Sequence, residues 1–249
     1  MRPILIVLVA VSAAALPAGA SSHPHLSAGA VLWSHDTNLD VESATEFDGT
    51  DDTADQMARD WDVLGSGAGL RIGYDFPKIV GLYGEVGVTQ ATVRDRDVED
   101  PSQDVGSLGF NDGAYYALGA RLGSDFAGTS NLFWTVEGSY RSVRTDLDED
   151  ITTSWDYDES RIAADGRIGV WVQQVGFFGG LRFVDASADL SETDTSNLPG
   201  EQTRNIELQR ENSADFLLGA QTRGSAVSGF AELGLGGAFS ASAGVRYGF

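Results

Sequence analysis

The last eleven residues alternate between apolar side chains and small or polar ones, and this pattern constrains the fold more than any other feature. The apolar side chains stand at every second position: Phe239, Ala241, Ala243, Val245, Tyr247 and Phe249. Serine, glycine and one arginine, Arg246, fall between them. Because successive side chains of a β-strand point to opposite faces, the pattern predicts a strand with one apolar and one polar face.

The same alternation recurs along the chain and predicts ten strands. The expected ranges are 25–35, 63–76, 80–94, 113–126, 131–145, 159–174, 176–190, 213–224, 226–236 and 239–249. In the second range, Leu70 and Ile72 share the face opposite Arg71. Repeated strands with one apolar and one polar face are typical of membrane-spanning barrels. We therefore predict an all-β fold, a transmembrane antiparallel up-and-down β-barrel of ten strands, with eight or twelve strands as alternatives.

Short and long connections alternate between the predicted strands. The long ones are polar and acidic, and they lie near 36–62, 95–112, 146–158 and 191–212. Outer-membrane barrels place short turns in the periplasm and long loops outside the cell. We therefore expect residues 21–249 to form one barrel domain with long acidic extracellular loops.

The first twenty residues have the composition of a cleaved signal peptide. A short basic start at Met1-Arg2 precedes an apolar run from Ile4 to Leu16, and Ala18-Gly19-Ala20 fits the small-residue cleavage rule. We expect residues 1–20 to be removed on export. The strand pattern then predicts the outer membrane of a Gram-negative cell as the destination.

The end of the chain resembles the signal that marks bacterial outer-membrane proteins for assembly. In that signal, a final alternating strand ends on aromatic residues with a terminal Phe, and Val245, Tyr247 and Phe249 match it. The resemblance implies the barrel assembly machinery as a partner. Outer-membrane lipid and lipopolysaccharide are the other expected partners.

The predicted architecture is similar to that of the small OmpA, OmpX and OmpW barrel families. The resemblance covers nearly the whole mature chain as an architecture, and only the terminal signature is a motif. It implies a rigid, monomeric membrane anchor whose exposed loops contact the envelope, other cells or host surfaces.

Aromatic residues are expected to form two girdles at the membrane surfaces. Tyr74, Phe76, Phe126, Trp134, Phe177, Tyr247 and Phe249 fall near the predicted periplasmic strand ends. Trp33, Tyr116, Tyr140 and Phe216 fall near the outer ends.

Composition excludes several classes of function. The chain has 37 acidic and 16 basic residues, and nucleic-acid binding needs a basic surface, so no nucleic-acid partner is expected. It has no Cys, which excludes disulfide scaffolds and thiolate metal sites. No cofactor is expected. Acidic residues in 36–62 and at 146–150 suit divalent cations such as Ca²⁺. No EF-hand spacing is present, so solvated acidic loops are the preferred interpretation, with cation binding as the alternative.

The inward faces of the predicted strands carry charges of alternating sign, which neighbouring strands can pair. The predicted lumen network is Arg71, Glu85, Arg121, Glu137, Asp165, Arg167, Arg182, Asp215, Glu232 and Arg246. With Asp75, Asp125, Arg141 and Arg223 included, seven arginines face seven carboxylates. A ten-stranded barrel is narrow, so we expect a cross-linked lumen that conducts weakly.

Two classes of non-enzymatic function follow from this lumen. The first is a structural barrel with a surface-interaction role. The alternative is a channel for small or hydrophobic solutes, which an apolar inward patch near the outer rim would favour. Inward aromatic and apolar residues are scattered in the predicted strands and favour the first: Tyr115, Phe133, Trp171, Phe178 and Leu217.

An enzyme is the third and least favoured class. Omptin proteases use paired acids with a His-Asp couple at the extracellular rim, and lipid A-modifying barrels use a His with a Ser. Of the three histidines, His23 and His25 fall at the mature N-terminus, so His35 is the only candidate near the outer rim. A lone His among many acids is a weak catalytic signal. No catalytic or metal residues are therefore assigned.

Overall fold

The computed structural model describes residues 25–45, 51–52, 60–76, 80–96, 104–126, 131–148, 153–194, 202–223 and 226–249. Residues 1–20, expected to be a signal peptide, lie outside this set, as do Glu149 and Asp150. The strands are β1 (His25–Thr45), β2 (Asp51–Asp52), β3 (Asp60–Asp75), β4 (Val80–Arg96), β5 (Asp104–Asp125), β6 (Leu132–Asp148), β7 (Thr153–Val172), β8 (Val175–Asp194), β9 (Gln202–Thr222), β10 (Val227–Leu235) and β11 (Ala238–Gly248).

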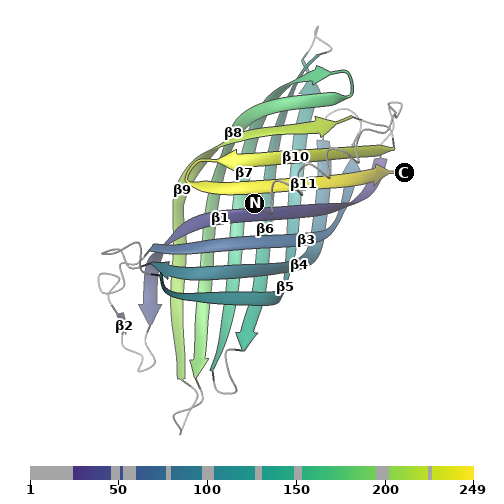
Figure 1. The fold of residues 1–249 in the computed structure, drawn as a ribbon. Helices are drawn as coiled ribbons and strands as arrows, with labels where there is room; N and C mark the ends of the chain where they lie inside the picture. Colours follow the sequence, from purple (N-terminus) through teal and green to yellow (C-terminus); the bar gives the residue numbers. More distant parts are fainter. Residues whose placement is uncertain are drawn as a thin grey trace.

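All strands except the two-residue β2 form a closed antiparallel ring, which confirms the predicted up-and-down barrel of ten strands. Sequence neighbours pair around the ring, and β11 closes it by pairing with β1 from Ser27↔Gly248 to Thr37↔Ala238. Figure 1 shows β10, β11 and β1 side by side at this closure. No helix among the described residues is long and apolar enough to cross a membrane.

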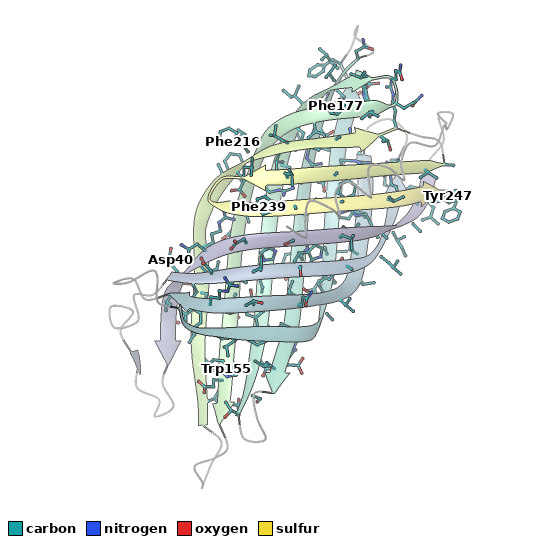
Figure 2. The ribbon with its side chains drawn as sticks, in the orientation of Figure 1. Asp40, Trp155, Phe177, Phe216, Phe239 and Tyr247 are labelled. Carbon is teal, nitrogen blue, oxygen red and sulfur yellow. The ribbon has the colours of Figure 1, made fainter. Side chains whose placement is uncertain are left out.

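The outer face of the ring carries a continuous apolar belt. Large apolar side chains are more than half exposed on many of its strands; examples are Leu70, Val88, Leu118, Ile168 and Phe216. Figure 2 shows Phe177, Phe216 and Tyr247 on the outside of the barrel. A water-soluble surface rarely exposes so large a contiguous apolar area, whereas lipid stabilises it.

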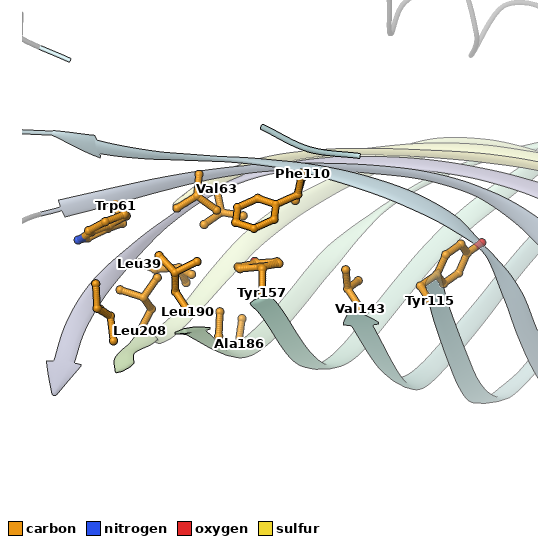
Figure 3. Packing of buried hydrophobic residues seen from close by; sticks show 14 of the residues in the cluster. Leu39, Trp61, Val63, Phe110, Tyr115, Val143, Tyr157, Ala186, Leu190 and Leu208 are labelled. Carbon is orange, nitrogen blue, oxygen red and sulfur yellow. The ribbon is translucent and has the colours of Figure 1, made fainter. Parts of the chain in front are cut away.

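Beyond this belt the strands continue with the opposite polarity. In β1, Asp36 and Asp40 are exposed outside, while Leu39 is fully buried inside. The apolar inward residues from eight strands pack into one cluster, which we call the outer core; Figure 3 shows most of its members. It consists of Val31, Trp33, Leu39, Trp61, Val63, Ala91, Val93, Phe110, Tyr115, Val143, Tyr157, Val184, Ala186, Ala188, Leu190, Ile206 and Leu208.

The number of strands around the interior falls from ten to eight at the level of the outer core. The hairpin of β10 and β11 turns between Leu235 and Ala238, and beyond it β1 pairs directly with β9, from Asp40↔Gln209. The eight remaining strands curl around the outer core. Eight strands enclose a space that side chains just fill, which explains why apolar packing replaces the wider lumen here.

Two bulges accompany this change of width. In β5, one extra residue between Phe110 and Tyr115 means that inward side chains have even numbers on one side of the bulge and odd numbers on the other. In β9, one extra residue between Arg210 and Asp215 has the same effect. A bulge bends its strand and increases the local twist. The bulges therefore keep apolar or paired side chains inside while the barrel narrows.

These strand ends correct the expected extent of the long loops near 36–62, 95–112, 146–158 and 191–212. β1 continues to Thr45, β5 begins at Asp104, β7 begins at Thr153 and β9 begins at Gln202. Several acidic residues of these stretches take outward positions on strands: Asp36, Asp40, Glu42, Asp146, Asp156, Asp158 and Glu207. The loop interpretation was wrong there because these parts of the strands have acidic outward faces and apolar inward faces. In the belt the outward face is apolar, so the strand pattern expected from the belt does not appear in them.

Candidate functional site

The lumen of the ten-stranded ring contains a connected set of ion pairs. At its centre, Arg167 contacts Asp165 at 2.6 Å, Glu232 at 2.9 Å and Glu137 at 3.2 Å. Arg182 contacts the same Asp165 at 2.7 Å and also binds Glu232. These five residues join β6, β7, β8 and β10 across the interior, so the cluster cross-links four strands in the middle of the lumen.

Two further pairs line the wall beside this central cluster. Arg71 Nε donates to Glu85 Oε1 at 2.6 Å, and its guanidinium lies 4.2 Å from the ring centre of Tyr83. Closer to the outer core, Arg210 Nη2 lies 3.4 Å from Asp215 Oδ1. Both carboxylates are buried, so each needs its arginine to offset the cost of desolvation.

Asp75 connects three strands at the rim that holds the chain end. Its two oxygens contact Arg121 at 3.1 Å and Arg246 at 3.0 Å. Arg246 Nε also donates to Ser228 Oγ at 2.7 Å. The last strand is therefore tied to β3 and β5 across the lumen as well as to β1 by its backbone.

All ten residues of the predicted lumen network thus face inward and take part in ion pairs: Arg71, Glu85, Arg121, Glu137, Asp165, Arg167, Arg182, Asp215, Glu232 and Arg246. At the terminus, Tyr247 and Phe249 point outward with their rings 5.1 Å apart. The backbone N–H of Phe249 donates to Leu26 O at 2.9 Å, which extends the closure with β1 by one residue.

Inward glycines give space to aromatic rings on the neighbouring strand. Trp33 lies over Gly67 and Tyr83 lies over Gly119, and a Cβ at either glycine would overlap the ring. The space that small lumen residues leave is therefore filled partly by rings.

His35 belongs to a buried polar cluster between the outer core and the charged lumen. Its Nε2 lies 3.3 Å from Glu159 Oε2, and its ring stacks on Trp33 with centres 5.3 Å apart. Tyr157 donates a hydrogen bond to Glu159 at 3.0 Å, and Arg161 contacts the other oxygen of Glu159 at 3.3 Å. The expected position of His35 near the outer rim is therefore corrected: it is inside the barrel and 2% exposed.

The His35 cluster lies beyond the apolar belt, because the outward neighbours of Glu159 are Asp158 and Ser160. Burial, together with the charge of Arg161, holds the pKa of His35 below its ordinary value of 6.5. Burial alone would raise the pKa of Glu159, but His35, Arg161 and the Tyr157 hydrogen bond outweigh it and lower that pKa. Burial raises the pKa of Tyr157 well above 10.

The lumen below the outer core contains a cavity of about 150 Å³. The cavity is lined at the end next to the outer core, which we call its upper end, by Trp33, His35, Arg141 and Arg161. The central ion pairs line its middle. A smaller cavity of about 30 Å³ shares several wall residues with it and reaches the level of Asp75 at the rim. The lumen is thus crowded, with small spaces between the charged side chains.

Sequence reasoning missed three residues of this region. Trp33 was assigned to the outer aromatic girdle, but it faces inward and is 5% exposed, since the inward parity of the first strand was not determined. The other two are Glu159, which borders the expected loop 146–158, and Arg210, which lies within the expected loop 191–212. The alternation of Ile206, Leu208 and Arg210 was the available signal.

The outward acidic residues do not form a recognisable metal site. Among the residues that the structure describes, no three His, Asp or Glu side chains are placed to hold a metal ion. Asp158, Asp189 and Glu207 do form a row across β7, β8 and β9, since each pairs directly with the next. Most of the acidic residues near 46–59 and 149–150 lie outside the described residues.

Comparisons with known proteins find no matching family and no similar curated sequence. Among solved structures, the chain is similar to the outer-membrane protease OmpT of Escherichia coli, with 12% identity, 90% of this chain and 97% of that one covered, and a TM-score of 0.49. It is also similar to the outer-membrane protein OprG of Pseudomonas aeruginosa, with 12% identity, coverage of 92% and 97%, and a TM-score of 0.48. For Neisserial surface protein A the identity is 16%, the coverage 93% and 99%, and the TM-score 0.28.

The closed ring, its apolar belt and its polar lumen define the class: the chain is a small β-barrel of the outer-membrane type. The similar structures differ in role, and none of them assigns an activity or a residue to this chain.

Proposed function

We propose that this protein is a closed structural barrel that holds a rigid acidic extension beyond the outer membrane for contacts at the cell surface. The observation that carries the proposal is the outer core. Its apolar side chains fill the interior where the strand number falls to eight, and Leu39, Phe110 and Leu190 are at most 1% exposed. A packed core at this level closes the lumen to solutes.

The extension suits a surface role because its strands, rather than loops, carry the acidic side chains. Asp36, Asp40, Asp158, Asp189 and Glu207 all face outward on strands. Strand-borne charges keep fixed positions, which lowers the entropy cost of recognition. Lipopolysaccharide and outer-membrane lipid are the partners of the belt in this proposal, with the tight turns in the periplasm.

Conductance in planar bilayers tests the closure. The full-length mature barrel is expected to give weak or intermittent currents, because ion pairs and the outer core both obstruct the lumen. Large and stable currents of porin size would overturn the proposal.

A channel for hydrophobic solutes is the second candidate function, because an apolar inward patch does exist near the outer end. In the structure, however, its side chains occupy the space against one another, as Phe110 does against Tyr157 with ring centres 5.7 Å apart. Liposomes loaded with the barrel distinguish the two functions. Faster uptake of a small aromatic hydrocarbon, with no swelling in sugars, would favour the channel; no uptake of either favours the structural role.

A further inference from the structure

One arginine in the lumen lacks the partner that its neighbours have. Eight arginines line the larger cavity, and among the described residues seven contact a carboxylate while Arg141 contacts none. The guanidinium of Arg141 lies 4.2 Å from the ring centre of Trp33 and 5.7 Å from that of Tyr115. Its Nε is buried and has no hydrogen-bond partner.

A second arginine stands directly opposite it. Arg141 on β6 and Arg161 on β7 are cross-strand partners, and both line the cavity. Like charges directly opposite on adjacent strands are destabilising, and the Cβ atoms of such a pair are roughly 5 Å apart. The Nε of Arg161 is also buried without a partner.

Two of the three nearby carboxylates are already engaged. Glu159 accepts contacts from Arg161, His35 and Tyr157, and Asp215 contacts Arg210. Glu85 is only half engaged, because Arg71 holds its Oε1 at 2.6 Å while its Oε2 is buried without a hydrogen-bond partner. The upper end of the cavity therefore has unused donors on two facing arginines.

We infer that the upper end of the lumen cavity binds a small oxyanion of the size of phosphate between Arg141 and Arg161. Guanidinium groups donate paired N–H bonds to oxyanions, and an anion between them converts a repulsive pair into an attractive one. The lumen cavity that both arginines line has a total volume of about 150 Å³. The smaller cavity near Asp75 shares Arg71, Tyr83 and Glu137 with this one on the side of the rim, while the outer core closes the other end. The inference goes beyond the proposed function and does not depend on it.

Calorimetry and thermal unfolding of the full barrel in detergent micelles test the site, with sodium phosphate compared against sodium chloride at equal ionic strength. The expected result is saturable phosphate binding and a rise in the unfolding temperature that chloride does not reproduce. Arg141→Gln is expected to weaken phosphate binding at least tenfold. Without phosphate this variant should unfold at the same temperature or higher, because the repulsion with Arg161 is removed.

Arg144→Gln is the matched control. Arg144 lies three residues along the same strand but faces outward, with a side chain 76% exposed, so phosphate binding should be unchanged. If Arg141→Gln does not fold, Arg141→Lys keeps the charge and should still bind phosphate more weakly, since an ammonium group lacks the planar fork. The inference is overturned if the wild-type barrel shows no saturable phosphate effect, or if both Arg141 variants bind phosphate as tightly as the wild type.

Discussion

The ten-stranded ring and the eight-stranded outer section of the barrel have opposite polarity on their inward and outward faces. In the ring, apolar side chains face out and long charged ones pair inside, as Arg182 does with Asp165 and Glu232. In the outer section, apolar side chains pack inside and acidic ones face out. Lipid around the ring and water around the outer section determine the polarity of the outer face. The number of strands determines the diameter of the interior that side chains must fill. Ion pairs with small cavities suit the wider part, and an apolar core suits the narrower part.

The largest expected effect comes from truncating the outer core. Phe110→Ala removes a ring with no exposed surface and should lower the free energy of unfolding by about 3–5 kcal/mol. Phe216→Ala is the matched control, because this ring is 67% exposed on the apolar belt and leaves no internal cavity. Urea unfolding in micelles measures both. Equal losses for the two variants would mean that the outer section is not packed as a core.

The next largest effect is expected from the charged lumen. Glu232→Gln leaves Arg167 and Arg182 to share fewer carboxylates, and breaking a buried pair typically costs about 3–5 kcal/mol. Because Asp165 still contacts both arginines, we expect a loss near 2–3 kcal/mol. Adding Arg182→Met to Glu232→Gln should recover part of this loss in the same unfolding assay. An unchanged free energy of unfolding for Glu232→Gln would show that the lumen is solvated rather than cross-linked.

Acid should weaken the boundary between the two regions. His35 is buried with a pKa below 6.5, so the unfolded chain binds a proton more readily than the folded one as the pH falls through 6.5. Stability should therefore decrease below pH 6.5, by at most about 1.4 kcal/mol per pH unit. The lowered pKa of Glu159 adds a further loss only below its ordinary value of 4.5. His35→Gln should flatten the unfolding free energy between pH 7 and 5; an unchanged slope would exclude His35 as the source.

Much of the ring could be predicted from sequence, and the outer section could not. Residues such as Arg71, Glu85 and Arg121 alternate along their strands with apolar residues. Because successive side chains point to opposite faces, the apolar ones face the lipid and the charged ones face inward. At the bulges in β5 and β9 that alternation shifts by one residue, and sequence alone does not show where. The pairing of β1 with β9 is also non-local, so the step from ten to eight strands needs the three-dimensional fold.

The partners within the lumen were harder to predict than its members. Alternating signs on neighbouring strands indicated a network, but Asp75 reaches Arg246 on a strand that is not its neighbour. Arginine side chains are long enough to cross a narrow barrel, so several pairings satisfy the same pattern. Only the structure shows that, among the described arginines of the lumen cavity, Arg141 is the one that contacts no carboxylate.

The smallest expected effect concerns the outward face of the outer section. Asp189 lies between Asp158 and Glu207 in a row of like charges, and burial together with these two carboxylates raises its pKa. Directly opposed like charges on a sheet cost roughly 0.2–1 kcal/mol, so Asp189→Asn should raise the free energy of unfolding by about 0.5 kcal/mol at low salt. The gain should shrink as salt screens the row. Asp185→Asn, on the same strand with the apolar Ile162 opposite, is the control and should have little effect. A gain that persists at 1 M salt would mean that charge repulsion is not its cause. No gain, or a loss, at low salt would mean that contacts within the extension balance the negative charge of this face.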